Sequence, residues 1–133
     1  MRELLFRGQQ RKKGEKVRLD GSPVESSWFY GSGVFQTQGD FSIIYQSEPV
    51  FCKHSVYSDT VGQYTGVTDK NGTKIFEGDI LRDDDAEENG IVVFEEGEFC
   101  VVFGNVEAYG IADIAYSCYV RGNIYDNPEL LEG

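Results

Sequence analysis

The side chains best suited to catalysis are few in this chain. His54 is the only histidine. Catalysis by histidine requires a nucleophile or an orienting carboxylate within hydrogen-bonding reach. Ser55, Ser58 and Asp59 follow His54 closely, but successive side chains of a strand point to opposite faces. We therefore expect a packed or surface imidazole and no enzyme activity.

The three cysteines offer a second kind of chemistry. Cys52, Cys100 and Cys118 are widely spaced and odd in number, which is typical of reduced, unpaired thiols. Together with His54 they would supply the four ligands that a zinc ion takes. The close Cys-x-x-Cys spacing of common zinc sites is missing, so we expect ordinary packed thiols and no metal or other cofactor.

Carboxylates are densest at Asp83, Asp84 and Asp85, followed by Glu87 and Glu88. Oxygen ligands suit Ca²⁺ and Mg²⁺, but the spacing does not match a 12-residue calcium loop. Adjacent like charges repel each other least when a loop is fully solvated. The sequence predicts an exposed acidic loop, with a partner-facing acidic patch or a weak cation site as alternatives.

The net charge of −11 is unevenly distributed along the chain. Residues 1–18 have a local net charge of +5, whereas residues 77–98 have one of −9. A surface that binds nucleic acid is normally basic throughout, because affinity comes largely from counterion release. Nucleic-acid binding is thus expected at most locally, through Arg11, Lys12 and Lys13 of a basic hairpin.

The elements that must position these residues read as short strands joined by tight turns. Asn71-Gly72 tolerates the positive φ angles of a hairpin turn, and it separates two β-prone runs. Strand 41–46 is rich in isoleucine and aromatic residues and is expected to be buried on both faces. Residues 111–114 form either a helical turn or a strand, and 128–131 a helical turn after Asn127 as N-cap. The predicted strands are 3–7, 16–19, 28–30, 34–37, 41–46, 50–57, 63–67, 73–76, 80–83, 91–95, 98–103 and 116–121.

Aromatic residues are frequent in the first half of the chain, and they have two interpretations. Large side chains fill the core of a small β protein, which is the favoured explanation. The alternative is an exposed patch of Trp28, Phe29 and Tyr30 that is covered in an oligomer.

Three blocks of sequence resemble the YopX family of phage and prophage proteins. They are MRELLFRGQQRKKGEKVR at the start, YSDTVGQYTGVTDKNGTKIFEGDILR at 57–82 and VRGNIYDNPELLEG at the end. The resemblance implies a mainly β protein with an SH3-like barrel or roll in the C-terminal part, made by a phage or prophage inside a bacterium. It carries no catalytic residues over to this chain. If the barrel has a groove, Tyr64 is the first choice for a ligand contact, although a buried tyrosine with a satisfied hydroxyl is the favoured interpretation of this residue.

The sequence therefore predicts a single unit, 1–133, with an N-terminal β lobe at 1–56 and a barrel at 57–133. It contains no apolar run long enough for a membrane span and no secretion signal, so a cytoplasmic protein is expected. The expected function is a non-catalytic accessory protein that binds another protein or its own copies. The alternative is a nucleic-acid-associated module that uses the basic hairpin.

Overall fold

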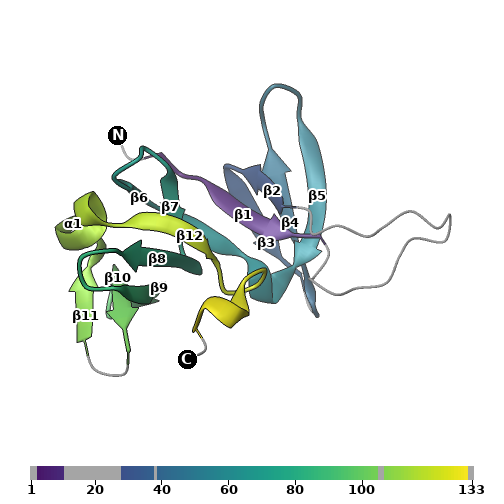
Figure 1. The fold of residues 1–133 in the computed structure, drawn as a ribbon. Helices are drawn as coiled ribbons and strands as arrows, with labels where there is room; N and C mark the ends of the chain where they lie inside the picture. The colour runs from purple at the N-terminus through teal and green to yellow at the C-terminus, as the bar shows by residue number, and fades with distance from the viewer. Residues whose placement is uncertain (1–2, 11–27, 38, 105–106, 132–133) are drawn as a thin grey trace, which may run out of the picture. The chain divides into compact units, whose positions relative to one another are not determined.

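The computed structural model describes residues 3–10, 28–37, 39–104 and 107–131 (Figure 1). The chain divides into two compact units, here called the N-terminal unit (Glu3–Gln63) and the C-terminal unit (Tyr64–Gly133). The division falls between Gln63 and Tyr64, a few residues beyond the boundary expected at 56–57. Strand β6 (Gly62–Thr68) begins in the first unit and continues into the second.

The N-terminal unit is built from two antiparallel groups of strands. Its first group pairs β1 (Phe6–Gln9) with β2 (Trp28–Gly31) on one side and with the start of β6 on the other. Its second group is a three-stranded sheet in the order β3-β4-β5, made by Gly33–Gln36, Phe41–Gln46 and Cys52–Tyr57. A 3₁₀ turn at Ser58–Thr60 leads into β6. The predicted partner of β1, residues 16–19, lies outside the described residues.

Two glycines let β1 and β2 pack closely on one face of the β3-β4-β5 sheet (Figure 1). A Cβ atom on Gly8 would lie 2.5 Å from a methyl carbon of Val56, and one on Gly31 would lie 2.2 Å from the carbonyl oxygen of Tyr45. Both distances are shorter than any real contact, so larger residues would force the layers apart. Ile44 and Val56 are completely buried on this face.

The hairpin β6–β7 (Gly62–Thr68 and Lys74–Phe76) opens the C-terminal unit, as the Asn71-Gly72 signal predicts. Gly72 has φ +84°, which an L side chain rarely adopts. One carboxylate oxygen of Asp69 accepts hydrogen bonds from the N–H groups of Asn71 and Thr73, both at 2.8 Å. The other accepts from the N–H of Val120, also at 2.8 Å, so Asp69 ties this turn to a strand 51 residues away.

A five-stranded antiparallel sheet forms the rest of this unit, in the order β11-β10-β9-β8-β12. One face carries an apolar core that includes Ile75, Leu81, Val92 and Val101. The strands are β8 (Asp79–Asp83), β9 (Glu88–Glu95), β10 (Glu98–Phe103), β11 (Glu107–Gly110) and β12 (Tyr119–Asn123). A mainly β fold is thus confirmed. The described strands leave β11 and β12 as open edges of this sheet, so the expected SH3-like closed barrel is not confirmed.

Helical structure is limited to short turns in the part of the chain that is described. The four-residue α1 (Ile111–Ile114) continues into a 3₁₀ turn at Ala115–Ser117, and a further 3₁₀ turn covers Pro128–Leu131. The helical turn predicted at 128–131 is confirmed, and the N–H of Leu130 donates to the Asn127 carbonyl at 3.1 Å. The Oδ1 of Asn127 accepts a hydrogen bond from the N–H of Asn123 at 3.2 Å. Among the described residues no helix is long and apolar enough to cross a membrane.

Candidate interaction site

The β3-β4-β5 sheet of the N-terminal unit has an aromatic outer face. Ser42, Ile44 and Val56 point to the packed inner face. Alternation along each strand and pairing across strands therefore place their neighbours on the opposite side. The aromatic face consists of Phe35, Phe41, Ile43, Tyr45 and Tyr57, with Phe51 just before β5. The prediction that strand 41–46 is buried on both faces is wrong, because Phe41 is 48% exposed.

This aromatic face contains two pairs of neighbouring rings, and its three phenylalanines are exposed to solvent. Phe41 stacks on Tyr57 with ring centroids 4.9 Å apart, and Tyr45 lies 6.3 Å from Phe51. Phe35 is 58% exposed and Phe51 is 62% exposed. With roughly 200 Å² for each phenylalanine side chain, Phe35, Phe41 and Phe51 expose about 330 Å² of ring surface. Apolar patches of a few hundred Å² often mark interaction sites on soluble proteins.

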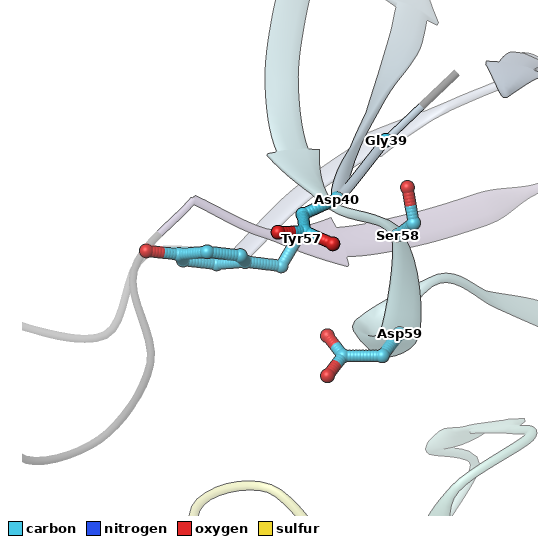
Figure 2. A pocket seen from close by; sticks show the side chains of 5 residues that line it. All are labelled: Gly39, Asp40, Tyr57, Ser58 and Asp59. Atoms are coloured by element: carbon cyan, nitrogen blue, oxygen red, sulfur yellow. The ribbon is translucent and has the colours of Figure 1, made fainter. Parts of the chain in front are cut away.

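A pocket of about 300 Å³ borders the aromatic face at Tyr57. Figure 2 shows the Tyr57 ring and the Asp59 side chain projecting to the same side. Gly39, Asp40 and Ser58 complete its lining. The backbone is fixed here, because Ser58 N–H donates to the Asp40 carbonyl at 2.8 Å and the Ser58 and Ser42 hydroxyl oxygens are 2.8 Å apart.

An aromatic ring bordered by two carboxylates suits a positively charged group. The face of a tyrosine ring attracts an ammonium or guanidinium ion, and a nearby carboxylate strengthens the attraction. Tyr57, Asp40 and Asp59 supply these groups in this pocket. The pocket can therefore hold the cationic end of a lysine or arginine side chain.

Tyr64 lies among core residues of the C-terminal unit. It is 6% exposed, and its ring centroid lies 5.6 Å from that of Phe76. The ammonium nitrogen of Lys74 is 5.4 Å from the centroid of the Tyr64 ring. This environment agrees with the buried tyrosine that the sequence favours, and a ligand contact by Tyr64 stays a prediction.

The acidic residues Asp83, Asp84 and Asp85 lie at the end of β8 and in the turn before β9. Asp83 caps the turn, since its Oδ1 accepts hydrogen bonds from the N–H groups of Asp85 and Ala86 at 3.0 and 3.3 Å. Asp84 is 59% exposed and lies 3.4 Å from the guanidinium of Arg82. The turn is thus held by its own hydrogen bonds, and its role toward a partner stays a prediction.

The sequence also singled out three basic residues and the histidine. Arg11, Lys12 and Lys13 lie outside the described residues. His54 stacks on Phe29 with centroids 4.0 Å apart, and its Nε2 is 3.0 Å from the Gln46 side-chain oxygen. It therefore packs against neighbouring side chains.

The thiols show no sign of a shared metal site. Cys52, Cys100 and Cys118 are all free. Burial raises the pKa of the Cys118 thiol, and burial followed by the charge of Glu98 raises the pKa of Cys100. Within the described part of the chain, no three His, Cys, Asp or Glu side chains come together in a way that could hold a metal ion.

Charge is divided sharply between the two units. The segment Glu3–Gln63 contains seven Lys or Arg and seven Asp or Glu, a net charge of zero. The segment Tyr64–Gly133 contains four Lys or Arg and sixteen Asp or Glu, a net charge of −12, and Arg2 brings the total to −11. The aromatic face thus belongs to the electrically neutral unit.

Sequence reasoning missed this face because it singled out another aromatic group. Trp28 and Phe29 are half-buried, and only Tyr30 of that predicted patch is exposed. The usable signal was the alternation Phe41-x-Ile43-x-Tyr45, which places apolar side chains on the face opposite Ser42 and Ile44.

The fold and the site define a mainly antiparallel β protein of two units, one neutral with an aromatic face and one strongly acidic. The family model described as YopX protein matches residues 24–132, and the chain belongs to the YopX family. The crystal structure of protein EF1440 from Enterococcus faecalis is similar, with a TM-score of 0.51 and 24% sequence identity. The match covers 97% of this chain and 98% of that one, and it shows a shared fold. No curated protein matches the chain.

Proposed function

We propose that this chain is a phage- or prophage-encoded accessory protein that acts by binding protein through the aromatic face, without catalysis. The observation that carries the proposal is the exposure of Phe35, Phe41 and Phe51 on one face of a sheet whose other face carries the buried residues Ser42, Ile44 and Val56. The phage or prophage origin rests on the family resemblance.

The energetics of the face support a binding role. Burying about 330 Å² of ring surface at roughly 25 cal/mol per Å² corresponds to about 8 kcal/mol before the costs of association. Those costs amount to about 4–15 kcal/mol in protein complexes. Covering this face together with polar contacts at its rim would therefore give weak to moderate affinity, as in transient complexes.

The charge balance of the N-terminal unit favours a protein partner over nucleic acid. Its seven basic residues are matched by seven acidic ones, whereas phosphate binding draws its affinity from an excess of Lys and Arg. The aromatic rings and the neighbouring carboxylates of Asp40 and Asp59 would instead suit a partner surface that carries apolar and basic side chains.

The test is affinity capture with tagged full-length chain expressed in bacterial cells. The wild type is compared with the double variant Phe35→Ser/Phe51→Ser, and Tyr116→Ser is the matched control because Tyr116 is 77% exposed in the other unit. We expect wild type and control to retain the same proteins, including untagged copies of the chain, and the double variant to lose them. Identical recovery by all three folded proteins would overturn the proposal.

A further inference from the structure

We propose that the partner of the aromatic face is a second copy of this chain, with Lys53 of each copy bound in the pocket of Asp40, Tyr57 and Asp59 of the other. This inference rests on the proposed function and names its partner. It is carried by the pattern of residues on the face and by the charges at its two ends.

The face is arranged in three rows that cross the strands. The middle row is Phe35, Ile43 and Ser55, as the pairing of β3, β4 and β5 shows. One flanking row is Gly33, Tyr45 and Lys53. The other is Phe41 and Tyr57, next to Thr37, whose hydroxyl donates to the Phe41 carbonyl.

A two-fold axis that runs along the middle row, between the two copies, would place each flanking row opposite the other flanking row of the second copy. Two sheets packed face to face about such an axis have their strands antiparallel, so each flanking row meets the opposite row of the other copy. Tyr45 then lies over Phe41 of the second copy, and Lys53 over Tyr57. Lys53 and Tyr57 are each two residues from Ser55, about 7 Å along the strand, so both contacts form at once.

The charges on this face agree with the same arrangement. Lys53 is an exposed cation at one end of β5, and Asp40 and Asp59 line the pocket at the other end. An ammonium group in that pocket would meet the Tyr57 ring as well as the two carboxylates. The charges of the N-terminal unit sum to zero, so they do not themselves oppose contact between two copies of this unit.

The test is sedimentation velocity of the full chain with paired charge reversals. We expect wild type to associate in the micromolar range, as suits a small interface. Lys53→Glu and Asp40→Lys alone should each weaken self-association by about tenfold or more, because like charges then face each other at both ends. An equimolar mixture of the two variants should form a heterodimer more strongly than either variant associates with itself. The unchanged Lys53 then meets an unchanged pocket at one end, and the two substituted residues carry opposite charges at the other.

Lys70→Glu is the matched control, because it makes the same charge change at an exposed site in the other unit. Circular dichroism establishes that each variant is folded. A wild-type monomer at about 100 μM, far above the expected Kd, would overturn the inference. A dimer whose Kd is unchanged by Lys53→Glu would overturn this arrangement. A mixture of the two variants that fails to recover association would also overturn it.

These outcomes are separable from failure of the proposed function. A monomeric wild type that still captures protein only when Phe35 and Phe51 are present would reject the second copy and retain the proposed function. If the double variant Phe35→Ser/Phe51→Ser captures the same proteins as wild type, the proposed function itself is rejected.

Discussion

Replacement of Asp69 by alanine tests how much the Asp69 carboxylate contributes to the stability of the Asp69–Gly72 turn. Its carboxylate accepts three backbone hydrogen bonds of 2.8 Å while only 6% exposed. Two come from Asn71 and Thr73 in its own turn, and the third comes from Val120 on β12. Asp69→Ala removes the acceptors and leaves three N–H groups without them.

The three losses are not equal. Asn71 and Thr73 are exposed, so water can replace the carboxylate at modest cost, about 1 kcal/mol each. Val120 is half-buried, and its N–H would lose a charge-assisted bond at a cost of about 2 kcal/mol. We therefore expect Asp69→Ala to lower the free energy of unfolding by about 4 kcal/mol. Asp69→Asn keeps one oxygen for the turn but places its NH₂ against the Val120 N–H, so its loss should be about 2 kcal/mol.

The assay is urea unfolding followed by far-ultraviolet circular dichroism. Fluorescence of Trp28, the only tryptophan, would report the other unit. Asp84→Asn is the control, because Asp84 is 59% exposed and its contact with Arg82 should contribute less than about 1 kcal/mol. An Asp69→Ala variant within about 1 kcal/mol of wild type would refute the reasoning, as would Asp69→Asn being the less stable of the two.

Two further predictions concern packing and a buried thiol. Gly31→Ala should destabilise the N-terminal unit by about 3 kcal/mol or more, because the added carbon meets the Tyr45 carbonyl at 2.2 Å. Gly72→Ala, which meets nothing within 4 Å but has φ +84°, should cost only about 1 kcal/mol in the same urea assay, and equal costs would contradict this. Because burial raises the pKa of Cys118 above the ordinary value of 9.0, its contribution to stability is present below pH 9 and lost as the pH rises further. Urea unfolding at pH 8 and pH 10 should show that loss in wild type and a smaller one in Cys118→Ala, and equal losses would contradict the prediction.

The local structure of this chain was largely predictable from sequence. Asn71-Gly72 marks a hairpin because few residues accept its backbone angles, and the hairpin is present in the structure. Runs of β-branched and aromatic residues located β4, β9 and β10. These signals depend only on residues that are close together in the chain, so a single sequence is enough to detect them.

Features that depend on distant residues were not predictable in the same way. The order β11-β10-β9-β8-β12 and the hydrogen bond from Val120 to Asp69 arise from pairing across long separations. The aromatic face was missed because the adjacent residues Ile43 and Ile44 place an apolar side chain on each side of β4. Only the glycines that admit β1 and β2 decide which side is packed.

The central claim is that the aromatic face of β3-β4-β5 is covered by protein when this chain functions. The most direct measurement is hydroxyl-radical footprinting of the full chain at about 1 and 100 μM, on either side of the expected Kd. The account predicts that modification of Phe35, Phe41 and Phe51 falls at the higher concentration, while that of Tyr116 is unchanged. Equal modification of the three phenylalanines at both concentrations, and also in the presence of captured protein, would contradict it.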